Sequence, residues 1–321
     1  MKAVIYTRYG GPEVLQIKEV EKPSPRDNEV LIKVYAVSIN DWDWGLIQGE
    51  PFITRIFFSG LKPRKQILGS DVAGKIESVG NNVQLFKPGD EVFGDLSGEW
   101  GGFAEYVCAN EKKLAVKPPS MTFEQAAAIP QAGMLAVQGL RAGHIQPGQK
   151  LLMNGAGGGV GTFAIQIAKI SGLEVTAVDS SAKFDMLRSL GVTDLIDYTQ
   201  EDFTKNQRRY DMILDVKTNR SPFAYMRALE PNGTYATVGG LLSRLFQAFS
   251  FSPLISMFSK KKVKVVALKA NKELSYMIDL FEAGKVRPVI DGHYELEEIE
   301  KAFNLFAKGD HKGKLVISVA T

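Results

Sequence analysis

The sequence predicts an α/β protein in which a mostly antiparallel β domain accompanies a doubly wound parallel sheet. Short β-like runs separated by Gly, Pro, Asn and Asp fill the chain up to about Pro119. A strand, a glycine-rich turn and a helix then follow one another between Lys150 and Gly172. From there strands and helices alternate, which is typical of a parallel sheet with helices on both faces.

The composition is that of a soluble globular protein. The chain has 321 residues, of which 45% are hydrophobic and 23% are charged. Its net charge of +3 is too small to indicate nucleic-acid binding. Cys108 is the one cysteine, so no internal disulfide forms, and we expect a reducing, cytoplasmic location. The N-terminal residues lack the apolar core of a secretory signal, and no run of about 18 apolar residues predicts a membrane span.

Turn signals separate the β-like runs of the first part. The runs are MKAVIY, EVLIKVYAVSI, AGKIESVG, DEVFGDL and FAEYVCA. Thr122 then has the position of a helix N-cap before FEQAAAI. We therefore expect the β domain to end at about residue 119.

The second part alternates between strand and helix. Helical patterns end at Gly172 and at Gly191. The predicted strands are KLLMN, LEVTAVD, LIDY, DMILDV, TYATVGG and KVKVVAL, the six of a full dinucleotide-binding sheet. After residue 269 come two helical segments, 273–284 and 298–309, with β-like residues between them and a final strand, KLVISVA.

The strongest local signal is the glycine loop in KLLMNGAGGGVGTFAIQIAK. Gly158 and Gly161 take the second and third glycine positions of a G-x-G-x-x-G motif, and Ala156 replaces the first. A pyrophosphate must approach backbone N–H groups at a helix N-terminus, where side chains would block it. We therefore predict that a nicotinamide dinucleotide binds along this loop, at Ala156, Gly157, Gly158, Gly159, Val160 and Gly161. The alternative is a structural turn, since tight turns also need glycine.

The end of the second strand of this sheet bears on the choice of cofactor. Asp179 lies where an acidic residue accepts hydrogen bonds from the adenosine ribose of NAD. Ser180, Ser181 and Lys183 follow and suit the 2′-phosphate of NADP. We expect NADP(H), with NAD(H) as the alternative. The predicted cofactor site also includes Tyr198, Val238, Gly239 and Lys314.

Motifs along nearly the whole chain resemble the medium-chain dehydrogenase/reductase superfamily, in its zinc-free quinone oxidoreductase and enoyl reductase branch. The segments that carry the resemblance are 1–25, 67–94, 101–133 and 154–169. The resemblance implies a GroES-like catalytic domain, from residues 1–119 and 269–321, and a Rossmann dinucleotide-binding domain, from residues 120–268. It also implies an active site in the cleft between them.

The positions that hold catalytic zinc in relatives carry other residues here. Asn40 stands at the cysteine position, Ser70 at the histidine position, and the later ligand falls near Gln131. None of them is a thiolate or an imidazole, which zinc prefers. We therefore expect no metal site and no zinc.

The candidate catalytic residues lie in SINDWDWGLIQG. We assign them as Asn40, Asp43 and Trp44, with Asn40 as the leading hydrogen-bond donor to the substrate. Asn40 also suits a turn, Asp43 a helix cap, and Trp42 and Trp44 either core packing or a flat wall for the substrate. Gly45 and Ile47 replace the branch's Lys and Arg, and residues 215–219, DVKTN, replace its D-x-V-G-G element.

Segments Phe52–Lys65 and Leu241–Lys264 mix large apolar residues with basic ones. Three interpretations stay open: a lid or dimer contact, a lipophilic substrate mouth with peripheral membrane contact, or a core helix. The last strand of the cofactor sheet, 262–268, is expected to lie at the sheet edge and to pair in a homodimer.

The function expected from these features is zinc-independent, NAD(P)H-dependent reduction of quinones or α,β-unsaturated carbonyls. The substrate is then a small lipophilic molecule. The altered segments make a second hypothesis plausible, namely a catalytically silent regulatory protein that binds the dinucleotide on the same fold.

Overall fold

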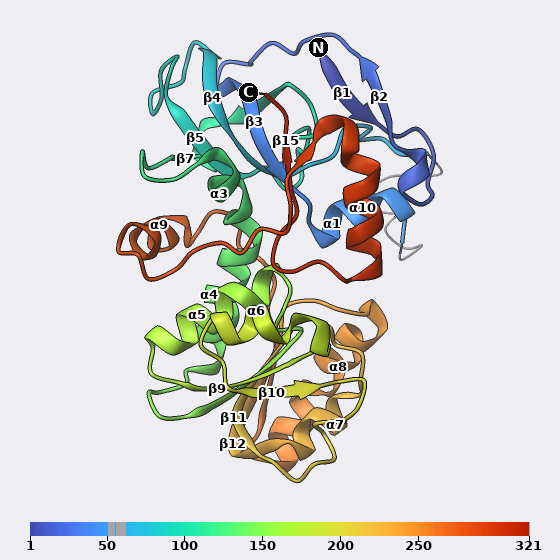
Figure 1. Cartoon of the computed structure of the whole chain (residues 1–321), viewed down its shortest axis with the longest axis vertical. Coiled ribbons are helices and arrows are strands. Elements are labelled where there is room, and N and C mark those ends of the chain that lie inside the picture. The colour runs from blue at the N-terminus through green and yellow to red at the C-terminus, as the bar shows by residue number, and fades with distance from the viewer. Residues whose placement is uncertain (51–54, 56–61, 321) are drawn as a thin grey trace. The chain divides into compact units, whose positions relative to one another are not determined.

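A computed structural model describes residues 1–50, 55 and 62–320. The chain divides into two compact units. Unit 1 comprises Met1–Gln131, Ala270–Ile278 and Ile290–Thr321, and unit 2 comprises Ala132–Lys269 and Asp279–Val289. The predicted fold class is confirmed, because one unit is built on a mainly antiparallel sheet and the other on a parallel sheet (Figure 1).

Unit 1 is organised around one large sheet. Within the described residues its order is β14-β15-β3-β4-β5-β7, with β6 also pairing with β3, while β1 and β2 form a separate hairpin. All of these pairs are antiparallel except β14 with β15. The strands are β1 (Lys2–Ile5), β2 (Gln16–Glu19), β3 (Glu29–Ser38), β4 (Asp71–Val79), β5 (Glu91–Asp95), β6 (Tyr106–Asn110), β7 (Ala115–Val116), β14 (Tyr294–Glu295) and β15 (Val316–Ser318).

Helices α1 (Asp41–Gln48), α3 (Phe123–Ala128) and α10 (Ile299–Lys308) complete unit 1. Thr122 is the N-cap of α3, as predicted, and its side chain and that of Gln125 bond each other's backbone N–H groups. Trp44 of α1 stacks on Phe303 of α10 at 6.3 Å between ring centroids, so α1 is held against the buried core.

Unit 2 contains the six predicted parallel strands. Their order within the described residues is β10-β9-β8-β11-β12-β13, and β13 lies at the edge, as expected. The strands are β8 (Lys150–Asn154), β9 (Glu174–Asp179), β10 (Asp194–Asp197), β11 (Tyr210–Asp215), β12 (Leu229–Thr237) and β13 (Lys262–Val265).

The helices of unit 2 lie on both faces of the sheet. From β8 the chain steps outward to β9 and β10, and from β11 it steps the opposite way to β12 and β13. Since such crossovers are right-handed, opposite steps place their helices on opposite faces. The helices are α5 (Gly159–Ile170) and α6 (Phe184–Ser189) on one face and α7 (Pro222–Arg227) and α8 (Leu242–Phe258) on the other (Figure 1).

The helices α4 (Pro130–Gly143) and α9 (Leu274–Glu282) each begin in unit 1 and end in unit 2. Residues 120–131 belong to unit 1, because Phe123 stacks on Tyr35 at 4.4 Å. Residues 279–289 belong to unit 2, because Gln166 and Arg287 exchange two hydrogen bonds. The units therefore differ from the predicted domain boundaries in these two segments.

No helix in the described part of the chain combines the length and the apolar composition that crossing a bilayer requires. Of the two apolar-basic segments, 241–264 forms α8 and β13. Most of segment 52–65 lies outside the described residues.

Candidate active site and cofactor loop

The glycine loop of unit 2 has the geometry that the motif predicts. Gly155 has φ of +82° and begins the turn out of β8. A Cβ on Gly161 would lie 2.4 Å from the carbonyl oxygens of Gly155 and Ala156, so only glycine fits there. A Cβ on Gly158 would meet no atom nearer than Gly155 O at 3.9 Å. The N-terminus of α5 is therefore open where a pyrophosphate is expected.

The predicted cofactor residues of unit 2 converge at one rim of its sheet. Residues 156–161 follow β8, residues 179–183 end β9 and follow it, Tyr198 follows β10, and residues 238–239 follow β12. Because parallel strands end on the same side, these loops share the carboxyl-end rim. The strand order reverses between β8 and β11, which is where ligands bind in such sheets.

Asp179 is turned into the glycine loop. Its carboxylate accepts hydrogen bonds from Gly157 N at 2.7 Å and from Ser180 N at 2.9 Å. Lys183 Nζ lies 3.7 Å from Asp179 Oδ1, and both side chains are buried. Asp179, which favours NAD in the sequence, and Lys183, which favours NADP, thus form one ion pair.

Asp215, at the end of β11, binds several neighbouring segments of unit 2. In the sequence it stands out only as the first residue of the altered segment 215–219. It accepts hydrogen bonds from Asn154 Nδ2 at 2.8 Å and from Tyr235 OH at 2.9 Å. The same carboxylate receives the backbone N–H groups of Lys217 and Thr218. The pKa of Tyr235 is raised by burial and then by the Asp215 charge. Segment 215–219 is therefore a tightly bonded turn, although it lacks the glycines of the branch.

Thr218 connects this turn to the end of β12. Its hydroxyl contacts Thr237 Oγ1 and donates to Gly239 O at 2.6 Å. These bonds hold Gly239, a predicted cofactor residue, against the turn after β11. The family resemblance points to glycines in this segment, and nothing in the sequence alone singles out Thr218 or Thr237.

In unit 1, the three residues that the family resemblance places at zinc-ligand positions lie together. Gln131 Nε2 donates to Ser70 Oγ at 2.7 Å, and Asn40 Nδ2 approaches the same oxygen at 3.4 Å. All three side chains are buried. Since Ser70 Oγ receives two N–H groups, its own hydroxyl hydrogen remains for another acceptor.

Lys314 reaches this cluster from the residues just before β15. Its Nζ donates to Asn40 Oδ1 at 2.5 Å and to Ile39 O at 2.8 Å, and lies 3.9 Å from Asp71 Oδ2. The structure thus places Lys314 beside the leading catalytic candidate, in unit 1. Its predicted role as a cofactor contact stays a prediction.

Asp43 and Trp44 contribute to the local structure of α1. Asp43 accepts hydrogen bonds from Asn40 N and from Gly69 N, both at 3.0 Å, so it caps the helix and ties it to the segment before β4. Complete burial raises the pKa of Asp43 to about 7. Trp44 is half-buried against Phe303, whereas Trp42 is exposed.

Further buried carboxylates surround the cluster. Asp71 Oδ2 accepts from Gln131 N at 3.1 Å, and Asp95 accepts from Ser97. Burial raises the pKa of Asp71 and lowers that of Lys314, while the attraction between the two opposes both shifts. Sequence reasoning missed these aspartates, because an acidic residue at a strand end is usually exposed.

The donor set of this cluster does not fit zinc. Asn40, Ser70 and Gln131 are neutral and bonded to one another, and the lysine that binds Asn40 would repel a dication. In the part of the chain that the structure describes, no three or more His, Cys, Asp or Glu side chains come together as metal ligands would.

Comparisons with known proteins find similarity in residues of both units. Residues 26–119 match the family described as "Alcohol dehydrogenase GroES-like domain". Residues 190–317 match the family described as "Zinc-binding dehydrogenase". A chloroplastic quinone-oxidoreductase from Triphysaria versicolor is 32% identical over 99% of this chain and 98% of its own. This chain belongs to the medium-chain dehydrogenase/reductase superfamily, in its quinone oxidoreductase-like branch.

Other members of the superfamily extend the likeness. A chloroplastic NADPH-dependent alkenal/one oxidoreductase from Arabidopsis thaliana is 30% identical over 99% of this chain and 79% of its own. The quinone oxidoreductase of Coxiella burnetii has a solved structure with a TM-score of 0.89 and 29% identity, covering 100% of this chain and 99% of its own. This medium-chain dehydrogenase/reductase therefore matches its relatives over both units, although its cluster at Asn40 carries no zinc-type ligands.

Proposed function

We propose that this protein is a zinc-independent reductase that uses NAD(P)H to reduce quinones or α,β-unsaturated carbonyls. The observation that carries the proposal is the neutral, hydrogen-bonded cluster of Asn40, Ser70 and Gln131 at the positions where relatives hold zinc. The quinone and alkenal reductases among its relatives support the same substrate class.

The glycine loop fits a dinucleotide. The open space at Gly158 and the backbone N–H groups at the start of α5 suit the pyrophosphate. Asp179, Ser180, Ser181 and Lys183 would hold the adenosine end, and Tyr198, Val238 and Gly239 flank the same rim. A bound reduced nicotinamide supplies a hydride. NADP(H) is our choice over NAD(H), supported by Lys183.

The chain's own residues polarise the acceptor. Lys314 binds Asn40 Oδ1, so the Asn40 amide presents its Nδ2 hydrogens toward Ser70 and its surroundings. Ser70 accepts from Gln131, which leaves its hydroxyl to donate. Such donors stabilise the charge that develops on the oxygen of a conjugated acceptor. An alkoxide needs stronger stabilisation, which zinc provides in other members of the superfamily.

An absorbance assay tests the proposal. The oxidation of NADPH and NADH is followed with quinones, enals, enones and primary alcohols. We expect turnover with the conjugated acceptors, little with alcohols, and no effect of zinc or of a chelator. Robust alcohol turnover with nothing from the conjugated acceptors contradicts the mechanism. No turnover of any of these substrates, despite tight cofactor binding, favours the regulatory alternative.

A homodimer remains part of the proposal. β13 is the edge strand of its sheet, and exposed edges pair with one another. Light scattering at micromolar concentration tests it, and a monomer contradicts it. The cytoplasmic location stays a prediction.

A further inference from the structure

Helix α8 turns an apolar face toward solvent. Leu242, Phe246, Phe249, Pro253 and Met257 recur at a spacing of four and three residues, so they lie on one side of the helix, which we call the outer stripe. Phe246, Phe249 and Met257 are each 70% exposed. Exposed helix faces normally carry charged or polar residues. This surface therefore needs an explanation other than packing within unit 2.

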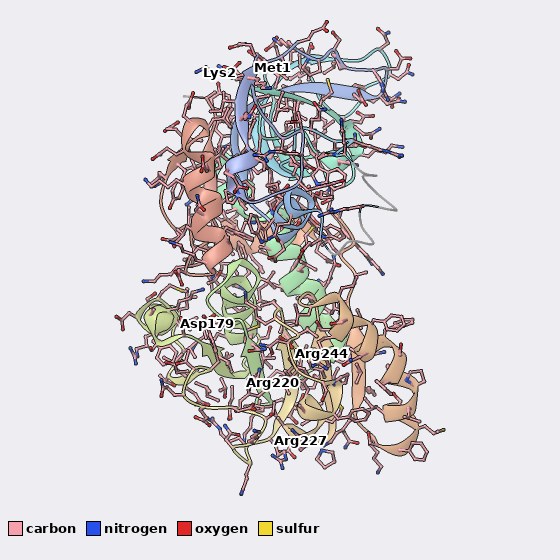
Figure 2. All side chains as sticks on the ribbon, turned by 90° about the vertical axis from the view of Figure 1, so that its right-hand side faces the viewer. Met1, Lys2, Asp179, Arg220, Arg227 and Arg244 are labelled. Carbon is pink, nitrogen blue, oxygen red and sulfur yellow. The ribbon has the colours of Figure 1, made fainter. Side chains whose placement is uncertain are left out.

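The opposite side of α8 makes the contacts with the sheet. Ala248 and Ile255 are buried in the core of unit 2, and Ser252 Oγ donates to Val263 O of β13 at 3.0 Å. The outer stripe therefore points away from the sheet and from its edge strand. Figure 2 shows aromatic side chains projecting outward from α8.

The apolar surface continues beyond the outer stripe. Phe258, the last residue of α8, is 77% exposed. Phe223 of α7 and Phe251 of α8 are also exposed and lie 5.3 Å apart between ring centroids. Exposed apolar side chains thus gather on two neighbouring helices, and such a surface marks an interaction site on a soluble protein.

A cluster of cations adjoins the end of α8. Lys205, Arg209, Arg227 and Lys261 line a depression of about 410 Å³, together with Thr204 and Gln207, and we call it the basic pocket. None of its lining residues is acidic within the described chain. Lys261 follows Phe258 by three residues, and its Nζ donates to Met226 O of α7 at 2.6 Å. The exposed C-terminal end of α8 and the basic pocket are thus neighbours.

The charges of the basic pocket favour an anion. Partial burial and then the Arg209 guanidinium lower the pKa of Lys261, while Glu230 opposes the shift. Arg209 and Lys261 come directly before β11 and β13, so the pocket lies at the amino ends of the strands. The predicted cofactor residues lie at the carboxyl ends. A ligand in the pocket therefore leaves the cofactor rim of unit 2 free.

We propose that the outer stripe of α8 and the basic pocket bind the surface of a membrane that contains anionic phospholipids. Apolar side chains of a surface helix enter the boundary between headgroups and acyl chains, and neighbouring cations bind lipid phosphates. A second copy is the less favoured occupant. In a two-fold contact the same cations would face one another, which costs affinity.

Vesicle flotation of the full-length protein tests this inference. The vesicles contain phosphatidylcholine alone or with phosphatidylglycerol. We expect binding to the anionic vesicles only, and weaker binding at high salt. Phe246→Ser with Phe249→Ser removes the apolar part, and Lys205→Gln with Arg227→Gln removes two cations. Each pair should weaken partitioning roughly tenfold or more. The exposed residues Leu85 and Lys87 of unit 1 provide the matched controls Leu85→Ser and Lys87→Gln.

Three outcomes overturn the proposal. The first is that the wild type does not float with anionic vesicles. The second is that the phenylalanine variants turn a wild-type dimer into a monomer and leave flotation unchanged, which assigns the stripe to a second copy. The third is that inorganic phosphate raises the melting temperature in an Arg227-dependent way without vesicle binding, which assigns the pocket to a soluble anion. Circular dichroism of each variant verifies folding, and reductase activity is not needed as a readout.

Discussion

Lys314 Nζ donates a hydrogen bond to Asn40 Oδ1 at 2.5 Å, and this contact orients the amide of Asn40. An asparagine amide has one end that accepts and one end that donates. With Oδ1 bound to an ammonium group, Nδ2 is the end turned toward Ser70. We therefore propose Lys314 as a positioning residue. With its Oδ1 bound to Lys314, Asn40 can offer only its donating end to a substrate.

Replacement of Lys314 tests this relationship. Lys314→Met frees Asn40 to rotate, and we expect kcat/KM for the quinone to fall roughly 10- to 100-fold. The variant also leaves Asp71 buried without its cation, which costs on the order of 3–5 kcal/mol of folding free energy. The double variant Lys314→Met with Asp71→Asn should recover stability in urea unfolding but not activity.

The exposed Lys308 provides a control for the loss of one positive charge, as Lys308→Met. Activity that returns together with stability in the double variant argues against positioning. It would mean that Lys314 acts only by neutralising Asp71.

The glycine loop allows a matched pair of substitutions. In Gly161→Ala the new methyl group meets two carbonyl oxygens at 2.4 Å, so we expect clear destabilisation. In Gly158→Ala it stands in open space, so unfolding should change by about 0.5 kcal/mol or less. The same methyl group faces the expected pyrophosphate, and the Kd for NADPH should rise at least roughly tenfold. Unchanged NADPH binding in a folded Gly158→Ala protein would mean that the pyrophosphate does not bind at this position.

The fold was predictable from sequence where local patterns decide it. The strand, glycine loop and helix at 150–170, the N-cap at Thr122 and the edge position of β13 all follow from periodicity and turn chemistry. The convergence of Asn40, Ser70 and Gln131 was predictable only through resemblance, since they lie far apart along the chain.

Other features of the site depend on tertiary contacts. Lys314 is more than 270 residues away from Asn40, and no local pattern links the two. The bonds of Asp215 to Asn154 and Tyr235 likewise join three strands. The ion pair of Asp179 and Lys183 could be suspected from its spacing of four residues, but which partner the carboxylate takes depends on how the glycine loop folds.

We expect the ion pair of Asp179 and Lys183 to influence which cofactor binds more tightly. We expect NADPH to bind more tightly than NADH, but by a small factor, because Lys183 is already paired with Asp179. Lys183→Met should weaken NADPH binding more than NADH binding, by roughly tenfold. Fluorescence titration with both cofactors measures this, with Lys150→Met as a control at the start of β8. Clearly tighter binding of NADH by the wild type contradicts the choice of NADPH.

Burial of Asp43 makes folding stability depend on pH at this residue. Its pKa in the folded protein is about 7, above the ordinary value of 3.8, because burial disfavours the charged form. Between these values the unfolded chain releases the proton that the folded protein keeps, so stability decreases as pH rises. Asp43→Asn does not titrate and retains one oxygen for Asn40 N or Gly69 N. The free energy of unfolding of the wild type, relative to Asp43→Asn, should therefore decrease from pH 4 to pH 7 and level off above it.

Urea unfolding at several pH values measures the difference, and Asp310→Asn at an exposed site controls for the loss of one negative charge. A difference that stays constant over this range means that the backbone N–H groups and Lys314 outweigh burial, and that Asp43 is ionised in the folded protein.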